Sequence, residues 1–234
     1  MCTRAPPQAS GEYSVTYGRA IVCIHGLASM SLAIGFGSTP LITTVLVSNL
    51  LGLVYSVPLP LLPARWKRYP AMAAGCIVAV RSLLVQIGFH EHLRAVVGPA
   101  TVQPWYENDK VLFSVVFFLA MGIVIALFKD VPDIAGDKQA NINTFAVRQG
   151  AQSIVNLCAL LVAAAFAGAV VYWAAVERHY VCAAGHALAG WWLRRKLLGT
   201  TVKGKEAAKS IRSSYMAIWR IFFVEYLLLM LSLY

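Results

Sequence analysis

The sequence has few charged residues, and only ten of its 234 residues are acidic. Asp, Glu, Lys and Arg together make up 13% of the chain, whereas they account for about a quarter of a typical soluble domain. Hydrophobic residues make up 59%, and the mean hydropathy is +0.67. This composition excludes a soluble globular protein and indicates one that crosses a membrane several times.

The sequence also lacks paired cysteines and a recognisable targeting segment. Its five cysteines form no C-x-x-C pair, and four of them fall in apolar stretches, which indicates packing residues and neither disulfides nor a zinc site. Residues 1–14 contain no hydrophobic core of a secretory signal and are too few for an organelle transit peptide. We expect a short polar segment over 1–14, followed by a single membrane domain over 15–234.

Apolar stretches of about 20 residues, the length needed to cross a bilayer, recur along the chain. The clearest is 111–128, which has no charged residue, and the weakest is 180–198, because three basic residues crowd its end. We therefore predict an all-α polytopic bundle of about seven spans. The predicted spans are 15–36, 39–57, 70–89, 110–128, 151–176, 180–198 and 214–234.

The basic residues divide unequally between the two sides of such a bundle. If the spans alternate, fifteen of the twenty Lys and Arg lie on the side that holds the N-terminus, 58–69, 129–150 and 194–213. Three lie on the other side, and two lie inside spans. Because loops rich in Lys and Arg stay on the cytoplasmic side or its stromal equivalent, we expect 129–150 on that face. Topology then accounts for the net charge of +10, and nucleic-acid binding is not implied.

A polar stretch, KDVPDIAGDKQANINTFAVRQG at 129–150, interrupts two long apolar runs. Its acidic residues Asp130, Asp133 and Asp137 are spaced i, i+3, i+7, so on a helix they would lie along one face. Carboxylates suit Mg²⁺, which takes one or two of them and completes its shell with water and substrate phosphates. The flanking basic residues, suited to a diphosphate, are Lys129, Lys138 and Arg148. The stretch predicts a magnesium and diphosphate site.

A simpler interpretation is that the acids cap the start of a helix. Asp130 and Asp133, with Pro132 between them, match an N-terminal capping pattern. Capping accounts for one acid or two, but it does not account for Asp137 or for the cations. The spacing therefore favours the metal and diphosphate interpretation.

One basic residue lies in the middle of a predicted span. Arg81 follows ten apolar or small residues at 71–80, and a charge at this depth costs about 2.5–3.5 kcal/mol. It should therefore face a partner or a polar cavity. Both a buried pair with Glu225 of the last span and a role in substrate binding remain open.

Two further polar stretches are expected to be loops. The first, 90–109, contains His90, Glu91 and His92, which are too few ligands for a metal site. The second, 199–213, is basic, and we expect it to contact lipid headgroups.

In combination, these segments resemble the UbiA-type membrane prenyltransferases, in the form found in plant homogentisate prenyltransferases. The most specific match is KDVPDIAGDK with TFAVRQG, which is similar to the second aspartate-rich motif of that family. Other similar stretches follow the family's order: ASGEYSV at 9–15, LGLVYSVPLP at 51–60 with RWKR at 65–68, AVRSLLVQIGF at 79–89, VIALF at 124–128 and SSYMAIWRIFFVEYLLL at 213–229.

The resemblance implies a nine-helix fold in which two aspartate clusters bind Mg²⁺ and a prenyl diphosphate, whose tail lies in an apolar tunnel open to lipid. It implies that Asp133 and Asp137 are a catalytic, metal-binding pair with Asp130 as an adjacent ligand, and that Tyr55 lies by the reacting carbon. The basic residues expected on the diphosphate are Lys67, Arg81, Lys129, Lys138 and Arg148.

The implied reaction is transfer of a phytyl, geranylgeranyl or solanesyl group to homogentisate, with loss of CO₂. It belongs to tocopherol, tocotrienol or plastoquinone biosynthesis in a plastid membrane. The chain departs from the family in lacking the first motif, NxxxDxxxD, and with it the first two helices, and Pro63 and Ala64 look inserted. Two hypotheses stay open: an aromatic prenyltransferase, or an inactive homologue that binds a prenyl diphosphate or partners a full-length relative in the membrane.

Overall fold

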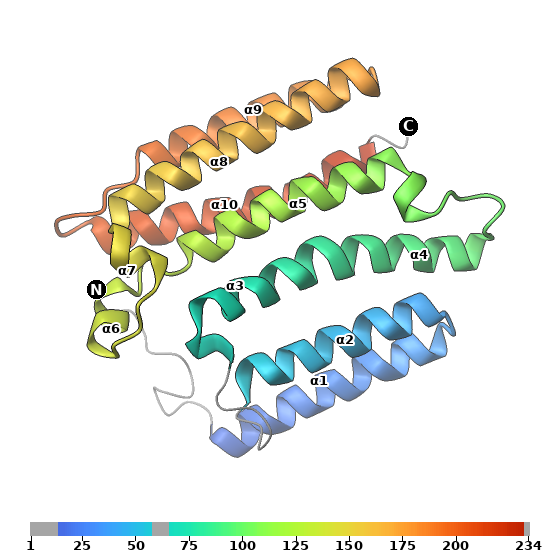
Figure 1. Cartoon of the computed structure of the whole chain (residues 1–234), viewed down its shortest axis with the longest axis horizontal. Coiled ribbons are helices and arrows are strands. Elements are labelled where there is room, and N and C mark those ends of the chain that lie inside the picture. Colours follow the sequence, from blue (N-terminus) through green and yellow to red (C-terminus); the bar gives the residue numbers. More distant parts are fainter. Residues whose placement is uncertain (1–13, 58–65, 232–234) are drawn as a thin grey trace.

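The computed structural model describes residues 14–57 and 66–231, which form helices, turns and loops without strands (Figure 1). The segments 1–13 and 58–65, which include most of ASGEYSV, Pro63 and Ala64, lie outside the described residues. In chain order the helices are α1 (Val15–Gly35), α2 (Thr39–Ser56), η1 (Trp66–Arg68), α3 (Pro70–Val78), η2 (Ala79–Leu84), α4 (Val85–Val97), η3 (Trp105–Glu107), α5 (Asp109–Phe128), α6 (Ile134–Gln139), α7 (Phe145–Gln149), α8 (Ala151–Val171), η4 (Tyr172–Val176), α9 (Tyr180–Leu198) and α10 (Ala207–Leu231). Among the short elements, η1 and η3 are 3₁₀-helices and η2 and η4 are π-helices.

Six helices in the described residues are long and apolar enough to cross a membrane: α1, α2, the continuous α3–η2–α4, α5, α8–η4 and α10. Side chains at their starts satisfy free backbone N–H groups, as when Ser38 accepts from Leu41 and Asn108 accepts from Val111. The remaining predicted span, 180–198, forms α9, which also has the length of a membrane helix. Because α9 carries three basic residues near its end, it is less apolar than the other six helices.

Successive long helices run in opposite directions, as Figure 1 shows. The start of α1, η1, α6, α7 and the turn between α9 and α10 lie at one end of the bundle. The turns that join α1 to α2, α4 to α5 and α8 to α9 lie at the other end. For the loops within the described residues, this alternation confirms the predicted division and places the acidic stretch at the end that is richer in Lys and Arg.

The core lies among α5, α8, α9 and α10. Half of the apolar window of α5 is buried, compared with 6% for α1 and 11% for α2, whose side chains are free to face lipid. The fully buried side chains of the core include Phe118, Met121, Ile154, Trp173 and Phe222. Three of the cysteines, Cys76, Cys158 and Cys182, are buried as free thiols, which confirms their predicted role in packing.

The predicted loop 90–109 is wrong in its first part, because α4 continues to Val97. His90 Nε2 lies 2.9 Å from a backbone carbonyl oxygen of the following loop, and Glu91 accepts a hydrogen bond from the Trp105 N–H at 2.9 Å. These contacts fold the loop back onto the helix end and satisfy polar groups that the sequence interpretation assigned to solvent.

The predicted loop 199–213 is also too long, because α10 begins at Ala207. Lys209 and Arg212 are exposed there, whereas Ile211 between them is buried. The helix therefore starts with one polar face, and the density of basic residues hid its period of 3.6 residues.

Glu225 has a different partner from the one predicted. Its Oε2 lies 2.9 Å from Nε2 of His186 on α9, with side chains that are 1% and 0% exposed. The contact ties α9 to α10, although the ring N–H is poorly aligned for a hydrogen bond. Arg81 packs on Trp219, about 9 Å earlier along α10. The predicted Arg81–Glu225 pair is therefore wrong, because the two residues meet different neighbours.

The pair α8 and α9 packs closely where α9 carries Gly190. A Cβ atom added at Gly190 would lie 2.6 Å from Cγ of Phe166 on α8, far inside a normal contact. Small residues at such crossings let membrane helices approach each other.

We expect Gly190→Ala to lower the free energy of unfolding by about 1–3 kcal/mol, because Phe166 or α9 must move. Gly168→Ala on α8 is the matched control, because its new Cβ atom meets nothing within 4 Å. The control should change stability by less than about 0.5 kcal/mol. Thermal unfolding in detergent measures both, and equal Tm values for the two variants would contradict the close packing at Gly190.

Candidate active site

The acidic stretch fills the connection between α5 and α8. α5 ends at Phe128, the chain turns through Asp130, and Asp133 is the N-cap residue of the short helix α6, which contains Asp137. Asp130 therefore lies outside the helix that carries Asp137, and the three acids do not share one continuous helical face. The turn is held by backbone hydrogen bonds from the Val131 N–H to Phe128 and from the Asp133 N–H to Asp130.

The side chain of Asp133 does not cap α6. No hydrogen bond joins it to a backbone N–H of α6, and only its backbone carbonyl accepts, from the Asp137 N–H at 2.8 Å. Asp133 is exposed at the surface, although neighbouring atoms cover part of its carboxyl group. The capping interpretation therefore leaves the carboxyl groups of Asp133 and Asp137 unexplained and available to a ligand.

The three carboxyl groups lie close enough to influence one another. Partial burial raises the pKa of Asp133, the negative charges of Asp137 and Asp130 raise it further, and Lys129 opposes them. Lys129 Nζ contacts Oδ1 of Asp130 at 2.8 Å. The segment is a concentration of negative charge with a single ion-paired cation at its edge.

Within the described segments, no three His, Cys, Asp or Glu side chains converge on one point that could hold a metal ion. Asp130 is already engaged with Lys129, which leaves Asp133 and Asp137 as the open carboxylates. Two carboxylates fit Mg²⁺, which characteristically takes one or two from the protein and its remaining oxygens from water and phosphate. The donor set therefore fits a metal that is held jointly with a phosphorylated ligand.

The other expected site residues, except Arg81, lie at the same end of the bundle (Figure 1). Tyr55 is half-buried one residue before the end of α2, and Lys67 is exposed on η1, which packs against α2. Lys138 is exposed on α6, and Arg148 is exposed on α7 with its guanidinium 5.6 Å from the ring centroid of Phe145.

The structure places these residues at one end of the bundle, but in two separate groups. The acids and Lys129 form one cluster, whereas Tyr55 and Lys67 stand on a neighbouring pair of elements. Across the described residues, no hydrogen bond or ion pair links those two side chains to the acidic cluster. Helix alternation accounts for their shared depth, since α2 and α5 both end there.

Arg81 lies deeper in the bundle, in the π-helical segment η2. Its guanidinium carbon is 4.6 Å from the ring centroid of Trp219 and 5.7 Å from that of Phe222. The sequence interpretation missed this stacking and the π-helix. The available signal was a single charge inside an apolar span, which shows that a partner is needed without naming it.

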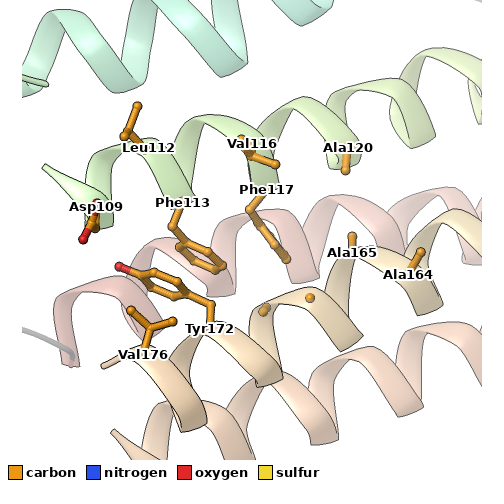
Figure 2. Close-up of a pocket in the computed structure, with 12 residues that line it drawn as sticks. Asp109, Leu112, Phe113, Val116, Phe117, Ala120, Ala164, Ala165, Tyr172 and Val176 are labelled. Carbon is orange, nitrogen blue, oxygen red and sulfur yellow. The ribbon is translucent and has the colours of Figure 1, made fainter. Parts of the chain in front are cut away.

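An apolar cavity of about 560 Å³ lies between the first half of α5 and the end of α8 (Figure 2). Its walls are formed by stacked rings of Phe113 and Tyr172, 4.4 Å apart and nearly parallel, and by small residues such as Ala120 and Ala165. Asp109 lies at one end of the lining. Ala120 is about 12 Å along α5 from its acidic end, so the cavity is separate from the acidic cluster.

The chain is similar to several homogentisate prenyltransferases. Homogentisate phytyltransferase 1, chloroplastic, of Arabidopsis thaliana is 39% identical over 95% of this chain and 56% of its own length. Homogentisate geranylgeranyltransferase of Triticum aestivum is 35% identical over 95% of this chain and 53% of its own length. Homogentisate phytyltransferase of Synechocystis sp. is 33% identical over 97% of this chain and 71% of its own length. No solved structure matches the chain.

This chain spans about half the length of the plant relatives it matches. The sequence model of the UbiA prenyltransferase family matches residues 2–221, which include the acidic segment and all of the long helices except the end of α10. The match thus runs through nearly the whole bundle, and the chain belongs to the UbiA prenyltransferase family.

Proposed function

We propose that this chain transfers a prenyl group from a prenyl diphosphate to homogentisate in a plastid membrane. The observation that carries the proposal is the acidic segment: two open carboxylates and several cations stand at one end of a membrane bundle. The names of the relatives support homogentisate as the acceptor. They include both phytyl and geranylgeranyl transferases, so we propose phytyl or geranylgeranyl diphosphate as the donor, beside the longer solanesyl diphosphate that the family resemblance implies.

The proposed reaction depends on a divalent metal, and we propose Mg²⁺. Asp133 and Asp137 are the residues that would hold it, with Asp130 as a third acidic neighbour. When bound, the metal supplies positive charge that stabilises the departing diphosphate. The acidic end corresponds to the stromal face of the proposed topology, because the basic loops are concentrated there.

The chain's own cations complete the diphosphate site. Lys129, Lys138 and Arg148 flank the carboxylates, and Lys67 stands at the same end on η1. Their N–H groups donate charge-assisted hydrogen bonds to phosphate oxygens and neutralise the charge that grows as the C–O bond breaks.

The reaction couples this bond cleavage to attack by the aromatic ring. A ring carbon of homogentisate donates its electron pair to C1 of the prenyl group as the bond from C1 to the diphosphate oxygen breaks, and it then loses its proton to restore the aromatic ring. The acetate side chain of the acceptor loses CO₂ and takes up a proton, which leaves a methyl group. Tyr55, half-buried beside this end of α2, borders the electron-poor prenyl carbon in the proposed arrangement. The apolar cavity along α5 is a place for the distal part of the prenyl tail, since its lining is almost wholly apolar.

A second candidate function is binding of a prenyl diphosphate without transfer. The observation that favours it is that the described residues at this end of the bundle contain a single acidic cluster. The other acid there, Glu206, is 76% exposed and lies beside Lys209. A homologue with one cluster would hold the metal and diphosphate weakly and would act as a binding or partner protein.

The double variant Asp133→Ala, Asp137→Ala tests the site. We expect it to lower Mg²⁺-dependent transfer of each labelled prenyl diphosphate to homogentisate by roughly a thousandfold, because both open carboxylates are removed. The assay uses the chain in membranes, and Glu206→Ala, which removes an exposed carboxylate at the same end, is the matched control. Full transfer by the double variant contradicts the site. Metal-dependent donor binding without transfer by the unaltered chain supports the second candidate.

The carboxyl of Asp133 should titrate at a higher pH than an ordinary aspartate, because burial and two neighbouring negative charges raise its pKa. Lys129→Gln should raise this pKa further, since Lys129 is the group that lowers it, and Asp137→Asn should lower it. Because the folded state holds this proton more tightly than the unfolded chain, the free energy of unfolding falls as the pH rises through this range.

The measurement is NMR of isotope-labelled aspartate in the metal-free protein. Lys203→Gln, a substitution of an exposed lysine in the turn before α10, serves as the control and should leave the titration unchanged. A Lys129→Gln variant in which Asp133 titrates at the same or a lower pH contradicts the electrostatic account.

A further inference from the structure

The third membrane-spanning segment of the described chain changes its hydrogen-bond pattern in mid-course. Residues Ala79–Leu84 form the π-helix η2 between the α-helical segments α3 and α4. Ser82 in this segment is fully buried against Gly122 of α5, and its Oγ has no hydrogen-bond partner. A π-helical turn shifts side chains out of the α-helical register and is frequent at functional sites. The neighbouring Arg81 is thereby directed toward α10.

Arg81 has an aromatic neighbour but no acidic one among the residues described. Its guanidinium packs on Trp219 at 4.6 Å, and Glu225, the acid of α10, contacts His186. Arg81 is half-buried. Packing on an aromatic face stabilises the cation by about 0.5–2 kcal/mol, less than the cost of placing a charge at this depth in a membrane. An anion bound beside Arg81 would offset the difference.

The polar side chains near Arg81 are uncharged and can donate hydrogen bonds. Among the described residues, the guanidinium N–H groups of Arg81 make no hydrogen bond or ion pair, so they are free for a planar, two-oxygen acceptor such as a carboxylate. Gln86 Nε2 donates to the Tyr226 hydroxyl at 2.9 Å, which leaves the hydrogen of that hydroxyl free to donate to another acceptor. A group of donors with no nearby acid is suited to an anionic, hydrogen-bond-accepting ligand.

The depth of Arg81 distinguishes it from the diphosphate site. Phe128, the last residue of α5, stacks on Tyr215 with ring centroids 6.2 Å apart, and Tyr215 contacts Trp219 at 6.3 Å. Trp219 is one helical turn beyond Tyr215 on α10, about 6 Å. Arg81 thus lies about one turn deeper in the bundle than the end of α5, where the acidic segment begins.

The distance between Arg81 and the acidic segment suits an aromatic acceptor that carries a carboxylate. In the reacting complex the diphosphate, the prenyl C1 and the aromatic ring follow one another, and the carboxylate of homogentisate extends from the ring on its side chain. An anion site one turn below the acidic segment is therefore on the far side of a small aromatic ring from the diphosphate. In the proposed site, Lys129 and Lys138 bind the diphosphate at the end of the bundle.

We propose that Arg81, held against Trp219 by the π-helical turn, binds the carboxylate of the aromatic acceptor and so orients its ring toward the prenyl carbon. The inference rests on the proposed prenyl transfer and reassigns Arg81 from the diphosphate, where the sequence interpretation placed it, to the acceptor.

The first test needs no substitution. Equilibrium binding of labelled homogentisate and of its methyl ester is measured with the whole chain in lipid nanodiscs. We expect the ester, which has the same ring without the negative charge, to bind about tenfold to a hundredfold more weakly. Equal binding of the two compounds overturns the proposal.

The second test uses Arg81→Gln, with Arg220→Gln as the matched control. Arg220 is the next residue after Trp219 and lies at the same depth, but its side chain is exposed. Arg81→Gln should weaken homogentisate binding by about tenfold to a hundredfold, bind the ester as the unaltered chain does, and leave binding of geranylgeranyl diphosphate unchanged. Arg220→Gln should change none of the three. Ester binding also shows that the Arg81 variant is folded, and Arg81→Lys should recover part of the affinity.

The outcomes separate this inference from the proposed function. Loss of geranylgeranyl diphosphate binding in Arg81→Gln, with homogentisate binding intact, overturns the inference and returns Arg81 to the diphosphate. Arg81-dependent binding of homogentisate by a chain that transfers no prenyl group supports the inference and contradicts the proposed function. Where transfer occurs, the KM for homogentisate should rise in Arg81→Gln while the KM for the donor stays the same.

Discussion

Every backbone N–H and C=O group in the core of a bilayer must find its hydrogen-bond partner within the chain, and this constraint determines the plan of the molecule. The long segments cross as helices, and most of the irregular, polar backbone is confined to the two ends. Because successive helices alternate in direction, segments far apart in sequence meet at one end. Tyr55, Lys67 and the acidic segment share that end for this reason.

The acidic segment is supported by the best-buried helices of the bundle. α5 and α8 flank it, and their facing side chains form much of the core, whereas α1 and α2 are largely exposed. Because α5 and α8 pack tightly, they fix both ends of the polar connection between them. Its short helices α6 and α7 can therefore hold carboxylates and cations near one another. The π-helix η2 packs against α5 and adds a polar position deeper in the same bundle.

Two charged groups lie inside the bundle and have different neighbours: Glu225 is buried, and Arg81 is half-buried. Glu225 contacts His186 inside a ring of aromatic side chains, and this contact ties α9 to α10. Arg81 packs instead on the face of Trp219 and keeps its N–H edge unused among the described residues. Since a charge with a protein partner has less need of a ligand, the unpaired guanidinium is the stronger candidate for substrate binding.

The sequence by itself determined the class of the protein, the position of its long helices, the sidedness of its loops and the location of the acidic segment. Length, hydropathy and charge are properties of each segment, so these features can be read one stretch at a time. The tertiary structure decided which faces meet. The Glu225–His186 contact, the packing of Arg81 on Trp219 and the break between Asp130 and α6 depend on how each helix is rotated about its axis and where its hydrogen-bond pattern changes. Those angles arise from side-chain packing between segments distant in sequence, such as Gly190 against Phe166, and hydropathy carries no information about them.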